Sequence, residues 1–309
     1  MELVPIGTHL YACLQPDRGL GWSNSGFIAA GGGLVVDTLY DQKLTAQMAD
    51  LYAEVHPETP ARVVNTHHNG DHCWGNKIFE EAEIIAHTGC AERFDEFTPA
   101  QAASMAAMVS PPPHLADIAE AFRDFHFDDV ELVPPNRVID GDLQLDLGGL
   151  EVEILYVGPA HTAGDLIVSV PDQGVVFAGD VVFHLCTPIG WEGTHQAWVE
   201  ALEAIEAMAP ETVVAGHGPL CDTAGVRAMR EYLEYVWEEA SAHHAAGRTT
   251  SQACQSIDPG QYASWNEPWR LAYNVHRAYK ELNGGAWDDS YHTGAAMADA
   301  ALLREQWAK

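Results

Sequence analysis

Basic residues are scarce in this 309-residue sequence: 15 Lys and Arg stand against 45 Asp and Glu, and the formal net charge is −30. Binding to a nucleic-acid backbone or to an anionic membrane surface requires clustered Lys and Arg, so both kinds of partner are disfavoured. The charge also disfavours strongly anionic substrates that approach from a distance. Solubility or adaptation to salt explains it better than an acidic face for a partner.

Long apolar runs and paired cysteines are missing as well. No apolar run approaches the roughly 20 residues that a membrane helix needs. The N-terminal MELVPIGTHLYACL has an early Glu and no basic segment, so no signal peptide is expected. The six cysteines, at positions 13, 73, 90, 186, 221 and 254, form no CxxC pair, which is typical of a reduced intracellular protein. We therefore expect a cytoplasmic protein.

Strand and helix patterns alternate along a chain that is 47% hydrophobic. Paired strands are expected over 1–37, around the turn Gly31-Gly32-Gly33, which is no phosphate-binding fingerprint because no GxGxxG follows. The other expected elements are helices over 41–56, 73–81, 89–97, 195–208, 223–246 and 268–283, and strands over 61–65, 83–87, 136–140, 143–147, 151–157, 166–170, 174–178 and 212–215. This order predicts an α/β fold rather than an all-β sandwich. We expect one domain, 1–309, with a helical C-terminal region at about 222–309.

Residues 98–135 differ in composition, being rich in Ala, Met and Phe and interrupted by three consecutive prolines. Two short helices around a proline turn are expected there. One interpretation is a surface insertion that packs its own small core. The other is a lid or substrate wall, to which the adaptable Met108 and the aromatic Phe122, Phe125 and Phe127 would contribute. Both stay open.

The most informative stretch is VVNTHHNGDHCWGN at 63–76, in which His67, His68, Asp71 and His72 fall within six residues. A β-branched run before a polar, glycine-containing loop predicts a buried strand that ends at a site. Imidazole and carboxylate at this density suit a divalent cation, usually zinc. A merely histidine-rich turn is the alternative.

Three further polar residues occur in a similar context, which favours the metal site over the turn. His161 lies in EILYVGPAHTAGD, Asp180 ends VVFAGD, and His217 lies in TVVAGHGP. Groups at strand ends, on glycine-containing loops, can converge on one cleft although they are distant in the chain. One histidine of this kind is usually structural, but the whole set indicates a metal centre.

These motifs carry a resemblance. HxxxDH at 67–72, GPAHTxGD at 158–165, FAGD at 177–180 and GHG at 216–218 resemble the metallo-β-lactamase-fold hydrolase superfamily. Within it, SNSGFI, GDVVF and NVHRAYKEL are similar to the cyclase/thioesterase branch of aromatic polyketide pathways. The resemblance implies an αββα sandwich with the metal site at one edge of two facing sheets.

The resemblance also implies a ligand set for one or two Zn²⁺ ions, with Fe or Mn as alternatives. Carried over by motif position, the first metal would be bound by His67 and His161, the second by Asp71, His72 and His217, and Asp180 would bridge them. The usual motif is HxHxDH, but here Asn69 takes the middle ligand position. A neutral amide is a poorer zinc ligand than imidazole. We therefore expect a first metal that is weak, exchangeable, different in identity or missing, and we expect His68 to point elsewhere.

The implied chemistry is hydrolysis. A bound metal lowers the pKa of its water from near 16 to about 7, so hydroxide becomes available to attack a carbonyl. Asp71 is the expected catalytic residue, because it would ligate, orient and pass a proton to the leaving group. His184 is a candidate pocket residue or a buried structural one, and Cys73 is expected to be structural. Cys221, His276 and Trp22 are weaker candidates for lining the site.

We therefore expect a metal-dependent hydrolase acting on an ester, thioester or lactone of a largely uncharged, partly aromatic small molecule. A metal-dependent polyketide cyclase and a non-catalytic metal-binding relative are the alternatives, and a homodimer stays open. An exported β-lactamase is disfavoured because no signal is expected, and RNA-processing relatives need a basic surface. A glutathione-thioester hydrolase usually offers Lys and Arg, whereas the C-terminal region here is acidic, and no length remains for a flavin domain.

Overall fold

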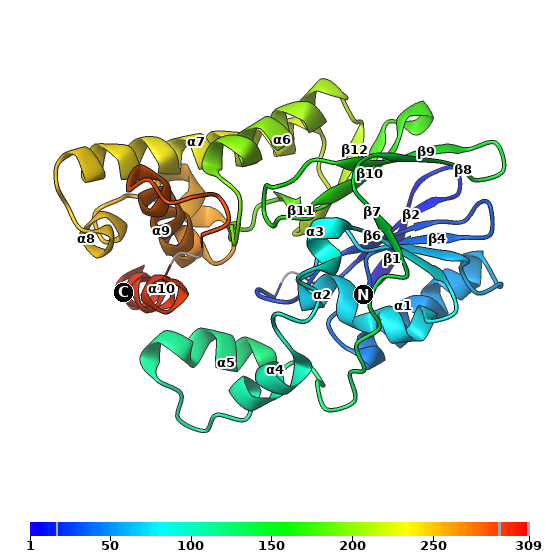
Figure 1. Cartoon of the computed structure of the whole chain (residues 1–309), viewed down its shortest axis with the longest axis horizontal. Helices are drawn as coiled ribbons and strands as arrows, with labels where there is room; N and C mark the ends of the chain where they lie inside the picture. The colour runs from blue at the N-terminus through cyan, green and yellow to red at the C-terminus, as the bar shows by residue number, and fades with distance from the viewer. Residues whose placement is uncertain (17, 290–291, 308–309) are drawn as a thin grey trace.

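Two β-sheets face each other, with helices against their outer faces (Figure 1). The structure, a computed structural model, describes residues 1–16, 18–289 and 292–307. The arrangement is the αββα sandwich that the resemblance implied, so the predicted fold class is confirmed. Over the described residues, none of the helices is both long enough and apolar enough to cross a membrane.

The N-terminal sheet has seven strands within the described residues, and they are hydrogen-bonded to one another in chain order. They are β1 (Glu2–Gly7), β2 (Leu10–Leu14), β3 (Ser25–Ile28), β4 (Leu34–Val36), β5 (Arg62–Val64), β6 (Glu83–His87) and β7 (Arg137–Ile139). β1 to β4 pair antiparallel, and β4 to β7 pair parallel. The loops that follow β4 and β5 therefore leave the sheet at the same edge.

The C-terminal sheet has five strands in the described chain, in the order β12-β11-β10-β9-β8. They are β8 (Leu143–Asp146), β9 (Glu151–Tyr156), β10 (Leu166–Val170), β11 (Val175–Phe183) and β12 (Thr212–His217). Sequence analysis expected the strand before Asp180 to end at 178, and this was wrong. The strand continues to Phe183 because a register irregularity at Gly179, where φ is +49°, lets the apolar VVF run resume pairing.

Three apolar layers hold the sandwich together. Leu34 and Val64 of the first sheet pack against residues of the second sheet such as Ile154 and Phe177. On the outer face of the first sheet lies α1 (Gln42–Val55), with Met48 buried. On the outer face of the second sheet lie α6 (His195–Ala207) and α7 (Thr223–Ala245), in keeping with the helices predicted there.

The remaining helices are short or lie near the C-terminus. They are α2 (Gly70–Cys73), α3 (Thr88–Ala91), α4 (Pro99–Ala106), α5 (Ala116–Phe122), α8 (Thr250–Cys254), α9 (Leu271–Leu282) and α10 (Thr293–Trp307), with 3₁₀ turns η1 (Trp74–Phe79), η2 (Pro113–Leu115), η3 (Pro171–Gln173), η4 (Gly260–Ser264) and η5 (Pro268–Arg270). The helix expected over 89–97 was wrong. α3 stops at Ala91, and after it Arg93 N–H bonds to Cys90 O and Glu96 N–H to Arg93 O, as in turns. α4 then begins at a capping box formed by Thr98 and Gln101.

The segment 98–135 contains α4, η2 and α5, beside α10 in Figure 1. Its Phe122, Phe125 and Phe127 are buried in an aromatic cluster around Tyr40 and Trp74. On its other side, Arg304 of α10 forms an ion pair with Asp117 of α5. The segment is thus fixed both to the N-terminal half and to the C-terminal helix. The division of the chain into one domain stays a prediction.

Candidate metal centre

Six of the predicted ligands converge at one edge of the two sheets. They form two groups, His67 with His161 and Asp180, and Asp71 with His72 and His217, and the potential ligand atoms in each group lie within 4.8 Å of one another. Three of them come from the loop and helix after β5, where α2 places Asp71 and His72 in its single turn. Of the other three, His161 lies in the loop after β9, Asp180 in β11 and His217 at the end of β12. The site therefore spans the edge at which the sheets meet.

Asp180 lies between the two groups. Its Oδ2 atom is 3.9 Å from His67 Nε2, and it is 3.4 Å from the Nε2 atoms of both His161 and His217. Its Oδ1 atom is 3.0 Å from His72 Nε2. One carboxylate that faces all four imidazoles has the position that a bridging ligand requires.

Each of the four imidazoles is oriented through its other nitrogen. The Nδ1 atoms of His67, His72, His161 and His217 lie 3.0 Å from Thr66 Oγ1, 2.9 Å from Asp37 Oδ2, 2.6 Å from Ile189 O and 3.2 Å from Trp22 O. Contacts of this kind fix the ring and its tautomer, and they leave Nε2 to face the centre. Sequence analysis did not identify these partners, apart from Trp22, which it considered only as a wall residue.

Asp37 is the charged member of this set. It is buried, with φ at +61°, and it also accepts hydrogen bonds from the Thr66 N–H and hydroxyl, each at 2.7 Å. It thereby ties the ends of β4 and β5 together beneath His72. A signal for it was available, because LVVD repeats the pattern of an apolar strand followed by a polar residue.

The side chains of Asn69 and His68 point to different surroundings. The Asn69 side-chain oxygen lies 2.7 Å from His161 Nε2, so it faces the first group of ligands. His68 lies near Arg93 and Glu192, and burial lowers its pKa to about 4. The expectation that His68 points elsewhere agrees with these contacts, and Asn69 lies beside the three members of the first group, where it could add a fourth donor atom.

The side chains present fit a divalent metal. His67 Nε2 is buried and has no hydrogen-bond partner among the described residues, as expected of a ligand atom that faces a cation. Burial lowers the pKa of His67, and that of His161 to about 4, so both rings are neutral and able to coordinate. Imidazole and carboxylate together are a donor set that zinc favours.

In the second group the pKa values of the histidines are raised, whereas in the first group they are lowered. Burial opposes a charge on His72 and His217, but the carboxylates of Asp180 and Asp71, with that of Asp37 for His72, together outweigh it and raise both pKa values, that of His217 to about 9. Burial likewise opposes the charge on Asp180, and the surrounding imidazoles, His217 foremost, lower its pKa well below the ordinary range. Protons here therefore occupy positions that a cation would take.

The weaker candidates lie outside the ligand set. Cys73 Sγ donates to the carbonyl oxygens of residues 68 and 69, consistent with a structural role. His184 Nδ1 lies 3.2 Å from Pro219 O, and His184 and Cys221 line a shallow groove that also includes Ile6. His276 contacts Asp299. Among these residues, the Trp22 carbonyl contacts the imidazole of His217, and Cys73 contacts the backbone carbonyl of Asn69.

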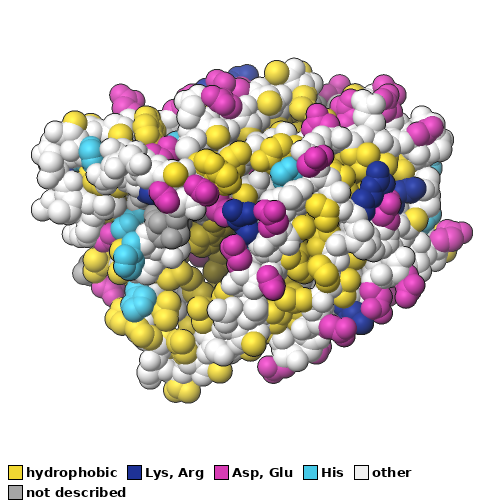
Figure 2. Space-filling model, viewed as in Figure 1, with side chains coloured by type: hydrophobic (Ala, Val, Ile, Leu, Met, Phe, Trp, Pro, Cys, Tyr) yellow, Lys and Arg dark blue, Asp and Glu magenta, His cyan; other side chains and the backbone are white. Residues whose placement is uncertain are grey.

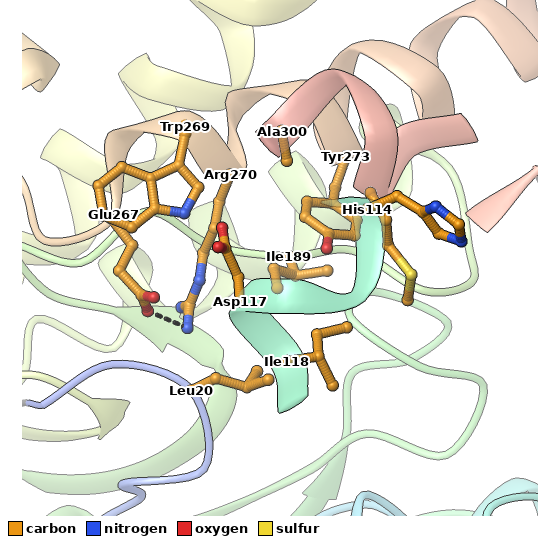
Figure 3. A pocket seen from close by; sticks show the side chains of 11 residues that line it. Leu20, His114, Asp117, Ile118, Ile189, Glu267, Trp269, Arg270, Tyr273 and Ala300 are labelled. Atoms are coloured by element: carbon orange, nitrogen blue, oxygen red, sulfur yellow. Dashed lines mark ion pairs between the residues drawn. The ribbon is translucent and has the colours of Figure 1, made fainter. Parts of the chain in front are cut away.

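A cavity lies between the segment 98–135 and the C-terminal helices (Figure 3). Its apolar walls are Leu20, Ile118, Ile189, Trp269, Tyr273 and Met297. Asp117 and the ion-paired Glu267 and Arg270 add charge. Two parts of the cavity wall lie close to the metal centre. The carbonyl oxygen of Ile189 contacts His161 Nδ1, and Leu20 is two residues from Trp22, whose carbonyl oxygen contacts His217 Nδ1.

Comparison with known proteins agrees with this geometry. A hydroxyacylglutathione hydrolase from Hyphomonas neptunium is 27% identical over 75% of this chain and 77% of its own length. One from Erythrobacter litoralis is 26% identical over 50% of this chain and 47% of its own length. The chain thus spans about half the length of some relatives.

Solved structures share the fold. The stereoselective inverting sec-alkylsulfatase Pisa1 from Pseudomonas sp. superposes with a TM-score of 0.69 at 19% identity, over 93% of this chain and 51% of its own. A metallo-beta-lactamase from Pontibacter korlensis gives 0.56 at 16% identity, over 75% of this chain and 98% of its own. The profile of the metallo-beta-lactamase superfamily matches residues 18–217, more than half of the chain. The protein therefore belongs to the metallo-beta-lactamase superfamily and is a metal-dependent hydrolase of that superfamily.

Proposed function

We propose that this hydrolase cleaves an ester, thioester or lactone of a largely uncharged small molecule with an apolar or aromatic part. The observation that carries the proposal is the convergence of four imidazole Nε2 atoms on Asp180, near a small cavity whose walls are part apolar and part charged. In the proposed assignment, His67, His161 and Asn69 would hold a first zinc ion, Asp71, His72 and His217 would hold a second, and Asp180 would contribute to both.

The ions would lower the pKa of bound water to about 7 and polarise the substrate carbonyl. The protein's own contribution is orientation and proton transfer. Asp71 Oδ2 lies 3.4 Å from His217 Nε2 and 3.8 Å from His72 Nε2. Burial opposes the charge on Asp71, but His72 and His217 lower its pKa, so it is an anion able to accept a proton and pass it to the leaving group.

The substrate class follows from the walls of the cavity and from charge. Leu20, Ile118 and Trp269 offer apolar surface, whereas Asp117 would repel an anionic group placed beside it. Figure 2 shows Asp and Glu spread over the viewed face and Lys and Arg in only a few places. An uncharged acyl or aryl group suits this environment best.

The curated relatives support a thioester as the bond to test first, since those named above are hydroxyacylglutathione hydrolases. A glutathione moiety would add negative charge, and the described cavity wall pairs its Arg270 with Glu267. We therefore expect an uncharged aryl or alkyl thioester to be a better substrate than a glutathione thioester.

The test begins with metal analysis of protein purified without added metal, followed by activity on reconstitution with zinc, iron or manganese. The substrates are a nitrophenyl ester, an uncharged aryl thioester, a hydroxyacyl-glutathione thioester and a thioester-bound polyketone. Metal-dependent cleavage of the uncharged ester or thioester is the expected result, with Asp180→Asn as the inactive control.

Other outcomes point to other functions. Ring-closed products from the polyketone without hydrolysis would identify a cyclase instead. A better rate with the glutathione thioester than with the uncharged one would overturn the proposed substrate class. Metal binding without turnover of any of these substrates would favour a non-catalytic relative.

A further inference from the structure

A third group of ligand-type side chains lies among the C-terminal helices. Cys254 ends α8, His276 lies in α9 and Asp299 lies in α10, and a thiol sulfur, an imidazole nitrogen and a carboxylate oxygen lie within 4.8 Å of one another. None of the three belongs to the metal centre described above. Three separate helices thus bring sulfur, nitrogen and oxygen donors to one point.

The group is buried and already ordered by hydrogen bonds. Asp299 Oδ2 lies 2.8 Å from His276 Nε2, and Asp299 Oδ1 accepts a hydrogen bond from Ser251 Oγ at 2.5 Å. Cys254 is fully buried and Asp299 is 5% exposed. The His276 side chain is 10% exposed, so it lies at the edge of the group and offers a route by which an ion could enter.

We propose that Cys254, His276 and Asp299 form a structural zinc site. Thiolate, imidazole and carboxylate are the three side-chain donors that zinc uses, and a thiolate does not suit the oxygen-binding ions Mg²⁺ and Ca²⁺. Ligand atoms around a tetrahedral zinc ion lie roughly 3.3–3.6 Å apart, as its usual bond lengths require. Small side-chain movements bring the three atoms to that spacing, and water takes the fourth position.

The proton balance is consistent with this proposal. Burial and the nearby Asp299 carboxylate raise the pKa of the Cys254 thiol, so without a cation it stays protonated. On zinc binding the thiol proton leaves to solvent, and the proton that His276 Nε2 shares with Asp299 moves to Nδ1, so that thiolate, Nε2 and carboxylate can all coordinate. Ser251 keeps its hydrogen bond to the other carboxylate oxygen and holds the ligand in place.

A zinc ion at this site would fix the position of α10, and with it the part of the cavity wall that α10 forms. α10 supplies Met297 and Ala300 to the cavity wall, and its Arg304 forms an ion pair with Asp117 of α5. Zinc would anchor α10 to α8 and α9 at one point, while Arg304 connects α10 to the segment 98–135. The competing arrangement is a metal-free clamp in which Ser251, Asp299 and His276 alone join the three helices.

Cobalt distinguishes the two arrangements. A thiolate bound to Co²⁺ gives a strong sulfur-to-metal charge-transfer absorption in the near ultraviolet. The proposed ligands of the metal centre at the edge of the two sheets (the first centre) include no cysteine. We expect this band when metal-free protein is titrated with Co²⁺ alone. It should be lost in Cys254→Ser, and it should persist in Cys73→Ser, which removes the cysteine beside the first centre, and in Asp180→Asn, which weakens that centre.

Failure would be unambiguous. If wild-type protein shows no charge-transfer band at the end of the titration, the zinc site is refuted and the metal-free clamp is the correct arrangement. This measurement uses no variant, so it does not depend on whether a variant folds. A band of unchanged intensity in folded Cys254→Ser would also overturn the proposal. Because the readout is a spectrum and not turnover, it is independent of the function proposed for the first centre.

Discussion

Asp37 Oδ2 lies 2.9 Å from His72 Nδ1, at the end of a strand that contributes no metal ligand. In this position an aspartate requires the imidazole to carry its proton on Nδ1 and leaves Nε2 free to coordinate. The orientation of a ligand in the second group therefore depends on a residue outside the histidine motif.

We predict that Asp37→Asn weakens metal binding at the second group by about 10–100-fold, the range for loss of such an orienting carboxylate. The amide keeps the size of the side chain, but its N–H₂ would face His72 Nδ1 and favour the tautomer with the proton on Nε2. Competition with a chromogenic chelator measures the effect. Asp146→Asn, at the exposed end of β8 where the carboxylate accepts from Gly149 N–H, is the control and should retain wild-type affinity.

Asn69 should limit metal retention in the first group. Its amide oxygen faces His161 Nε2 at 2.7 Å, but it is a weaker zinc donor than an imidazole. Dialysis against mild chelator should leave about one zinc ion at the first centre, and Asn69→His should raise retention towards two. The counts are made in the Cys254→Ser background, so that zinc bound there does not enter them. Equal retention of two ions before and after the substitution would show that the first group is already complete.

Zinc binding should release protons at neutral pH, mainly from the second group. In the metal-free protein the pKa of His217 is about 9 and that of His72 is raised, so at pH 7 both rings are charged and must lose a proton to coordinate. The pKa of His161 is about 4, and that ring releases none at pH 7.

Apparent affinity should therefore rise by roughly tenfold per pH unit for each proton released and level off above about pH 9. Calorimetric titration in buffers of different ionisation enthalpy, again in the Cys254→Ser background, counts the protons directly. Binding heats that do not change with the buffer at pH 7 would refute this assignment of charge.

The two faces of the segment 98–135 should respond differently to mutation. Ile118 lines the cavity, so Ile118→Ala should change KM for a bulky aryl ester and leave KM for a small ester nearly unchanged. Phe125 packs between Trp22 and Tyr40 and is 5% exposed, so Phe125→Ala should lower the free energy of unfolding by about 3–5 kcal/mol.

Steady-state kinetics with a size series of esters, together with denaturant unfolding, separate the two effects. If Phe125→Ala shifts KM in proportion to substrate size at unchanged stability, the cavity extends further into the aromatic cluster than its walls indicate.

Sequence analysis singled out six of the residues that lie together at the candidate metal centre, because each follows a short apolar run and lies within a motif of fixed spacing. Their role as metal ligands stays a prediction. The Ile189 and Trp22 carbonyls were beyond such reasoning, because every residue has a carbonyl and only tertiary packing selects which one meets a histidine. The end of β11 was misjudged for a related reason. The expected strand ended at residue 178, before Gly179, yet pairing with β12 carries β11 through that glycine.

The placement of Asp180 has a consequence for the motions of the molecule. Its carboxylate meets His67 from the first sheet and His217 from the second, so metal bound between them would cross-link two halves of the chain. An ion that binds only the folded state adds about 2.7 kcal/mol at a hundred times its dissociation constant. That gain would be concentrated at one edge, while elsewhere the sheets are held together by apolar packing and by hydrogen bonds such as those between Thr8 and Gln173. Amide hydrogens in the loops after β5 and β9 should therefore exchange with solvent faster when the ion is removed, while the amide hydrogens within the strands of the two sheets stay protected.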